Sequence, residues 1–327
     1  KKKKSSRRRR SGDDDDDDDG EEEPEEEEAM KLEEVVLSCT QDAFFSEQRF
    51  ANFGDLGTAV KTMLDDYQKE TQMNEKISSI EDMQSFVARY PAFRSQSLNV
   101  SKHVALISEL SRLVDVCALM DVSQLEQDIA CHDDRSGQWR AVLDMVTDPR
   151  VKAPDKLRLA MLYVLRYEGS ANVDRLKNAL EDAGLGLDKV ALLDAVIEYA
   201  GKRVRGPGLF GANKSIMSKM TKSLKNSLDG IENVYAQHNP LLSDVIDLAA
   251  KGKLKDQHYP ALAAVASTAA KPTAVIAYVV GGATYEEATK VNEINASNSG
   301  FKVLLGGSYI HNSTSFLDDL ADAFTAV

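Results

Sequence analysis

"AVIAYVVGGATYEEA", residues 274–288, joins a continuous apolar run to a glycine pair and the start of a helix. A continuous apolar run is typical of a strand that is covered on both faces of its sheet. "FKVLL" (301–305) repeats the pattern before a second glycine pair. The order strand, helix, strand predicts two parallel strands with a right-handed crossover. The C-terminal part of the chain is therefore expected to be α/β.

The first glycine pair, Gly281-Gly282, raises the question of a nucleotide site, because the N-termini of helices attract phosphate. Neither glycine pair has the spacing of a Rossmann or Walker phosphate loop. Thr284 and Glu287 instead form a T-x-x-E capping box, which satisfies the first amides of the helix internally. We therefore expect tight turns here, and not a phosphate site.

The middle of the chain has helical periodicity, with apolar residues at steps of three and four. Pro91 interrupts one such stretch, since proline disfavours the helical state of the residue before it. Residues 80–120 are therefore predicted to form a helical hairpin that turns at "RYPAFRSQSLNVS" (89–101), with Ser101 as the N-cap of the second limb. Further elements are expected at 51–67, 155–168, 188–201, 214–228 and 241–251 (helices) and at 33–41 (one short strand).

The charge is concentrated in the N-terminal tail. Residues 1–28 contain eight basic and fourteen acidic side chains, which leaves −7 of the net charge of −13 for the rest of the chain. Like-charge blocks without apolar residues predict a disordered tail over residues 1–30. The mildly acidic remainder has no general affinity for nucleic acid.

No constellation of residues indicates catalysis. The three cysteines are widely scattered, and "CHDD" (131–134) cannot direct four adjacent side chains at one ion. His311 has Ser313 and Ser315 nearby, but no nucleophile elbow accompanies them. The longest apolar run, Ala274–Val280, is too short to span a bilayer. We expect no cofactor, no metal ion and no enzymatic activity.

Two parallel strands are too few for a stable sheet with two buried faces. The chain offers one other predicted strand, near residue 35, more than two hundred residues upstream. Partner strands are therefore expected outside this sequence. The chain would then be the C-terminal part of a larger protein, with a helical block inserted into a split α/β domain.

Five stretches of the chain, taken in order, are shared with a known family: "YPAFRSQSLNVSKHVALISELSRLV" (90–114), "VIEYAGKRVRG" (196–206), "GIENVYAQHNPLL" (230–242), "KGKLKDQHYP" (251–260) and "VVGGATYEEA…VLLGGSYIHNSTSFL" (279–317). Together they resemble the SM family of SNARE-binding proteins, and within it the vacuolar protein sorting-associated protein 45 branch. The resemblance extends from about residue 33 to residue 324.

The resemblance implies a mostly α-helical fold with a C-terminal α/β part, in which a helical domain is inserted into a split, incomplete parallel α/β domain. By this map residues 31–41 end the first part of the split domain, residues 42–268 are the helical insertion and residues 269–327 are the second part. The first domain of the family would be absent.

The resemblance also implies a function: regulation of SNARE assembly in vesicle docking and fusion, in endosome, Golgi and vacuolar transport. The protein would be a cytosolic monomer that reaches membranes only through syntaxin-type and other SNARE partners. In the family the hairpin holds SNARE motifs in register, and residues 92–101 would furl or extend. Contact candidates on its exposed surface are Arg89, Tyr90, Pro91, Phe93, Lys102, His103 and Leu106, of which Tyr90 and Leu106 could equally be hairpin core.

Two alternatives remain at this stage. One is a nucleotide-using α/β enzyme, and the other is a truncated helical scaffold without a binding function of its own.

Overall fold

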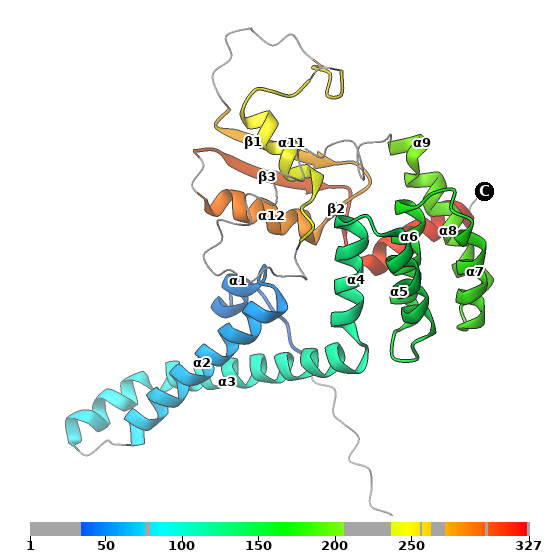
Figure 1. The fold of residues 1–327 in the computed structure, drawn as a ribbon. Helices are drawn as coiled ribbons and strands as arrows, with labels where there is room; N and C mark the ends of the chain where they lie inside the picture. The colour runs from blue at the N-terminus through cyan, green and yellow to red at the C-terminus, as the bar shows by residue number, and fades with distance from the viewer. Residues whose placement is uncertain are drawn as a thin grey trace, which may run out of the picture. The chain divides into compact units, whose positions relative to one another are not determined.

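The computed structural model describes residues 34–75, 79–205, 237–255, 257–262, 272–297 and 300–325. In these ranges the protein is mainly helical and has a small parallel α/β part near its C-terminus (Figure 1). The predicted fold class is confirmed. The charged tail and the helix predicted at 214–228 lie outside the described residues.

The first described residues form no strand. Residues 34–42 have extended or turn backbone, and α1 (Ala43–Gln48) follows directly. The carboxylate of Asp42 accepts a hydrogen bond from the N–H of Phe45 at 2.9 Å, and so satisfies one of the first amides of α1. The strand predicted at 33–41 is wrong for residues 34–41, because a strand forms only where another strand completes its ladder.

A long helical hairpin follows, made of α2 (Phe53–Glu75) and α3 (Ile80–Val116), which lie side by side (Figure 1). Tyr67 stacks on Phe93 with ring centroids 5.4 Å apart, and Val60 and Val100 are buried. Ser79 and Asp82 form a capping box at the start of α3.

The predicted hairpin turn at Pro91 is wrong. Pro91 lies inside α3, which continues as one helix through residues 89–101, so Ser101 is a mid-helix residue and not an N-cap. A proline removes one helical hydrogen bond, but packing on both sides of Pro91 offsets this loss. Phe86 and Phe93 are in edge contact with each other, and Phe93 also stacks on α2.

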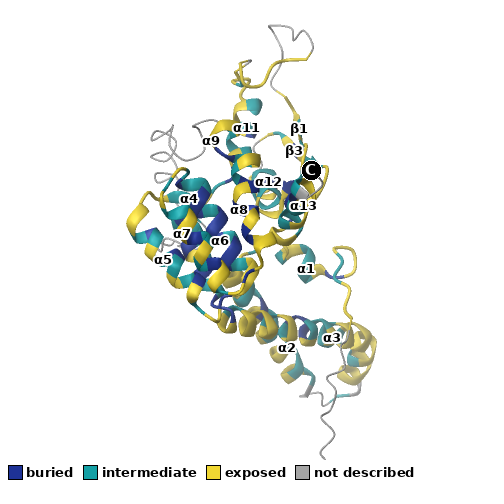
Figure 2. Cartoon of the chain, turned by 90° about the vertical axis from the view of Figure 1, so that its right-hand side faces the viewer, coloured by how far each residue is buried: buried dark blue, intermediate teal, exposed yellow. Residues whose placement is uncertain are grey.

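The next helices form a bundle with one hydrophobic core. They are α4 (Leu119–Cys131), α5 (Arg135–Thr147), α6 (Ala153–Arg166), α7 (Asn172–Asp182), α8 (Leu187–Ala200) and the short α9 (Lys202–Arg205). Figure 2 shows buried residues gathered on α4, α6 and α8. The helices predicted at 155–168 and 188–201 are confirmed, with Pro154 in the first turn of α6 and Gly201 as the C-cap of α8.

The last described helix, α13 (Ser313–Thr325), belongs to the same core. Leu320 is buried in it, and Phe316 and Leu317 pack against it. Arg158 of α6 forms ion pairs with Glu126 of α4 and with Asp155, and it donates to the hydroxyl of Ser313 at 3.4 Å. Helix α13, which follows the α/β part in the sequence, thus packs in the bundle.

That α/β part pairs β1 (Ala274–Val279) with β3 (Lys302–Gly307) in parallel, Val275 opposite Val303. The linking helix α12 (Tyr285–Ala296) begins at the predicted capping box of Thr284 and Glu287. Short strands β2 (Ala283–Thr284) and β4 (Ile310–His311) form a second parallel pair. The predicted strands and their parallel pairing are confirmed.

The β1–β3 sheet is covered on one face. There, α12 and α11 (Leu241–Ala250) bury Ile246, Val291 and Val303 in a small core. On the other face Ile276 is 75% exposed and Leu304 is 62% exposed. The expectation that both faces are covered is wrong within the described part of the chain. The expectation that partner strands lie elsewhere stays a prediction.

Candidate functional site

One flank of α3, beside the side that packs on α2, is apolar and exposed. Phe93, Val100 and His103 are buried or partly buried, and Phe93 stacks on Tyr67 of α2. The flank presents four exposed large apolar side chains in the first half of the helix: Met83, Val87, Tyr90 and Leu98. We call these four residues the distal row.

The spacing of the distal row explains why it stays exposed. Steps of four, three and eight residues keep Met83, Val87, Tyr90 and Leu98 within one narrow face of a helix with 3.6 residues per turn. A helix that is apolar on two faces needs two partners. Within the described residues, α2 covers only one of these faces. The row is therefore a surface on which another apolar face can pack.

A second group of exposed apolar residues continues along α3 toward the bundle. These residues are Leu106, Leu110, Leu113 and Val116. They begin on a neighbouring face, because the eight residues from Leu98 to Leu106 turn the position by about 80° around the helix axis. Exposed contiguous apolar surface of this kind marks interaction sites in soluble proteins.

The structure places the predicted contact residues in two groups. Arg89, Tyr90, Pro91 and Leu106 are exposed, with Tyr90 at 49% and Leu106 at 38%. Leu106 is therefore not a core residue of the hairpin, whereas the Tyr90 ring, although exposed, lies edge-on to Phe86 with centroids 5.7 Å apart.

The other predicted contact residues are partly or fully covered. Phe93 is half-buried against Tyr67, and Lys102 is half-buried and donates to the side-chain oxygen of Asn99 at 3.2 Å. His103 is only 6% exposed. Its expected place on the exposed surface is wrong, because it falls on the side of α3 that α2 covers. Met83, Val87 and Leu98 were missed, since the predicted turn at Pro91 divided the row that connects them.

The charges on this stretch of α3 have one sign. Arg89, Arg94 and Lys102 lie between residues 83 and 108, and no aspartate or glutamate occurs there. The chain as a whole has a net charge of −13. Such a local basic surface on an acidic protein favours acidic partners.

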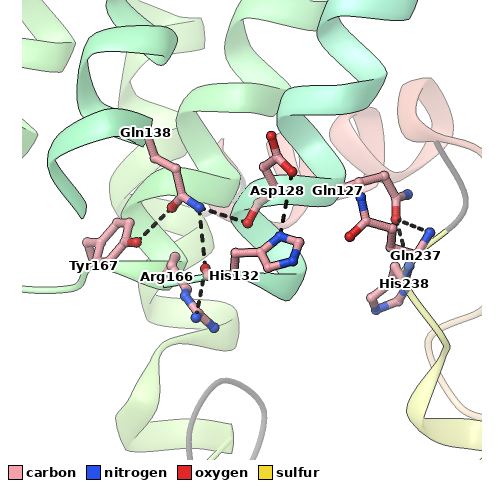
Figure 3. A network of polar contacts seen from close by, with 8 residues as sticks. All are labelled: Gln127, Asp128, His132, Gln138, Arg166, Tyr167, Gln237 and His238. Atoms are coloured by element: carbon pink, nitrogen blue, oxygen red, sulfur yellow. Dashed lines mark hydrogen bonds and ion pairs between the residues drawn. The ribbon is translucent and has the colours of Figure 1, made fainter. Parts of the chain in front are cut away.

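A polar network at the end of α4 has a structural role. The side chain of Gln138 donates to the carbonyl oxygens of Asp128 (2.7 Å) and His132 (3.3 Å) and accepts from the hydroxyl of Tyr167 at 2.7 Å (Figure 3). Arg166 donates to the same carbonyl of His132 at 2.9 Å. These bonds satisfy the carbonyl of the C-cap residue His132 and give a second partner to the carbonyl of Asp128, which also accepts from the N–H of His132.

Gln127 extends this network to a later segment. Its side-chain oxygen accepts from the backbone N–H groups of Gln237 (3.0 Å) and His238 (2.6 Å) (Figure 3). A cavity of about 280 Å³ beside the network is lined by residues that include Asp128, His132 and Asp134. In the described ranges no three His, Cys, Asp or Glu side chains are arranged to hold a metal ion. Cys131 of "CHDD" ends α4, and His132 is the C-cap of that helix.

His311 also acts within the fold. Its ring nitrogens lie 2.9 Å from the carbonyl oxygen of Gly281 and 3.1 Å from the hydroxyl of Ser315. Ser315 meanwhile exchanges hydrogen bonds with Asn312 at the start of α13. The serine hydroxyl is thus committed to capping a helix, and the group holds the glycine turn against α13.

These features define a mainly helical protein with a partial parallel α/β unit and a row of exposed apolar side chains along one helix of a long hairpin. The chain belongs to the Sec1 family, whose sequence model matches residues 12–319.

Curated relatives agree with this assignment. The chain is 41% identical over 292 residues to vacuolar protein sorting-associated protein 45 of Rattus norvegicus, which covers 88% of this chain and 51% of that protein. The protein of the same name from Dictyostelium discoideum is also 41% identical over 292 residues, covering 89% and 51%. The chain spans about half the length of these relatives.

Solved structures share the fold. The SM protein Vps45 in complex with the Qa SNARE Tlg2 (1–310) superimposes with a TM-score of 0.77 at 37% identity, over 91% of this chain and 52% of that one. The Unc18–syntaxin 1 complex from Monosiga brevicollis gives a TM-score of 0.65 at 20% identity, over 88% and 51%. The second likeness concerns the fold alone.

Proposed function

We propose that this chain binds the helical motif of SNARE proteins along the exposed face of α3 and regulates SNARE assembly in vesicle docking and fusion. The observation that carries the proposal is the distal row, Met83, Val87, Tyr90 and Leu98, on a helix whose other apolar face is already packed against α2. The family membership supports it, and so does the Qa SNARE named in the solved complex of a similar protein.

The physics of such binding is simple. An amphipathic segment that is disordered alone must lose conformational entropy when it becomes a helix. A preformed apolar face offsets that loss by burying the apolar side of the segment. On this proposal α3 acts as a template, and the candidates for contact are the distal row with Arg89, Pro91, Lys102 and Leu106.

The proposal includes a cellular setting. The protein would act without catalysis, as a cytosolic monomer on Golgi and endosomal membranes, and its SNARE partner would provide the attachment. Among the described residues no helix has the length and apolarity needed to cross a bilayer.

Direct titration tests the proposal. The purified chain is titrated with the cytosolic part of a Qa SNARE of the Tlg2 type, and binding is followed by calorimetry. Saturable binding is expected. Leu98→Asp should weaken it by about tenfold or more, because an exposed leucine that becomes buried on binding contributes about 1.5–3 kcal/mol.

A matched control is Leu187→Asp, which changes an equally exposed leucine at the start of α8 and should leave binding unchanged. Both variants should keep the helical circular dichroism of the parent chain. Absence of binding by the parent chain, or equal losses in both variants, would contradict the proposal.

The alternative functions have less support. A nucleotide-using enzyme needs a glycine loop between a strand and a helix. The spacing G-x-G-x-x-G does occur at residues 206–211, but that stretch follows helix α9 and not a strand. A scaffold without binding leaves the exposed distal row unexplained. A melting temperature that ATP, GTP and NAD leave unchanged would favour the proposed function over a nucleotide-using enzyme.

A further inference from the structure

Arg94 stands in the middle of the distal row. The row runs in steps of three and four from Met83 to Tyr90, and the next apolar member, Leu98, comes eight residues later. Arg94 fills the intervening position, four residues after Tyr90 and four before Leu98, and is itself exposed. Residues at these steps lie on one face of a helix, so a cation interrupts an otherwise apolar surface.

A cation in this place affects which helix can pack there. A partner helix that covers the distal row also covers Arg94 and removes water from its guanidinium group. That desolvation is unfavourable unless the partner presents a carboxylate. Arg89 and Lys102 add to the positive potential, and no acidic residue between 83 and 108 compensates for it.

We propose that the exposed face of α3 between Met83 and Leu106 selects an amphipathic helix with an acidic side chain inside its apolar stripe, and that the pairing of this acid with Arg94 fixes the register of the bound helix. This inference rests on the proposed function and adds the chemistry of the partner. A single buried polar pair sets register in the same way in coiled coils, where any shift along the seam leaves a charge without its partner.

The test is a charge exchange at one position. The probe is the SNARE motif of a Tlg2-type Qa SNARE, together with a series in which each acidic residue of the motif is replaced by lysine in turn. Arg94→Glu should weaken binding of the unchanged motif by about tenfold. One lysine replacement, and only one, should restore binding to the Arg94→Glu chain.

A matched control is Arg140→Glu, which makes the same change of net charge at an exposed position of α5. It should leave affinity within about twofold, because exposed charges far from the contact are screened by salt. Arg94→Leu should keep much of the affinity for the unchanged motif while losing the preference between acidic and lysine-substituted motifs.

The outcomes separate this inference from the function on which it rests. If the parent chain binds the motif and Leu98→Asp weakens binding, but Arg94→Glu behaves like Arg140→Glu, the register role of Arg94 is wrong and the proposed function stands. If every lysine replacement restores binding equally, the charges act without fixing register, and the inference is again overturned. If the parent chain binds no motif, both fail.

Discussion

Gly282 lies directly against the ring of His311. A Cβ atom on Gly282 would stand 2.2 Å from Cδ2 of the imidazole, and Gly282 has a positive φ of 114°. The same ring lies 2.9 Å from the carbonyl oxygen of Gly281. The glycine pair that follows β1 therefore serves close packing between the strand end and the C-terminal helix, as the sequence predicted when it favoured tight turns.

Replacement of Gly282 by alanine should destabilise the α/β part strongly. The new methyl group must displace His311 or distort the turn, and the backbone conformation adds strain, so a loss of about 2–4 kcal/mol is expected. Hydrogen exchange of the amides in β1 and β3 would report the loss locally.

Gly300→Ala is the matched control. Gly300 also has a positive φ, 81°, but a Cβ there would meet no atom within 4 Å. Its effect should be limited to about 1 kcal/mol of backbone strain. Equal losses for Gly282→Ala and Gly300→Ala would show that the contact with His311 contributes little.

Substitutions at Phe93 and at Tyr90 should have different effects on stability and on binding. Phe93 stacks on Tyr67 across the hairpin, so Phe93→Ala should lower the free energy of unfolding of the hairpin by about 2–3 kcal/mol. Tyr90 is 49% exposed and touches only the edge of Phe86 in its own helix, so Tyr90→Ala should reduce affinity for the Qa SNARE motif and change stability less than Phe93→Ala does.

Denaturant unfolding and calorimetric titration of both variants provide the measurements. The assignment of the two faces would be contradicted if Tyr90→Ala unfolded the hairpin and Phe93→Ala left it intact.

The ion pair between Glu126 and Arg158 should make stability depend on pH. Burial raises the pKa of the Glu126 carboxyl above its ordinary value, and this effect outweighs the opposing influence of Arg158. The folded state therefore binds a proton more tightly than the unfolded state, and stability falls as pH rises from the ordinary pKa of 4.5 through the raised pKa.

Glu126→Gln removes the titrating proton, while Arg158 keeps its ion pair with Asp155 at 2.8 Å. The stability of the variant relative to the parent chain should therefore rise across this pH window, as measured by denaturant unfolding between about pH 4 and pH 7. Arg158→Leu should instead lower stability by about 2–3 kcal/mol at neutral pH, because it leaves Glu126 without its counter-charge. A difference between Glu126→Gln and the parent that does not change with pH would contradict the assignment.

Local patterns in the sequence predicted much of the fold. Strands β1 and β3, the capping box at Thr284 and the helices α6 and α8 have signals within a few residues, and the structure confirms them. Pro91 was misread, because its preference for a helix end is a local tendency of a few kcal/mol. The stacking of Phe93 on Tyr67 overrides it, and that contact joins residues that no local pattern connects.

The candidate site also depends on contacts that local sequence patterns do not predict. The sequence pointed to the correct region of the chain, but the predicted turn placed His103 on the surface and divided the distal row. The spacing of Met83, Val87 and Tyr90 already placed them on one stripe, and only the continuous helix reveals that Leu98 shares their face. Packing between α2 and α3 decides which face of α3 is covered. The periodicity of each helix alone does not specify this packing.

The position of Leu320 in the bundle core bears on how this protein is made. Helix α13 closes a core whose other helices, α4 to α8, end more than a hundred residues earlier in the sequence. During translation those helices must wait, with apolar surface uncovered, until α13 has left the ribosome. Chaperones would meet the nascent chain in that interval, and a premature stop codon ahead of residue 313 would leave the bundle permanently open.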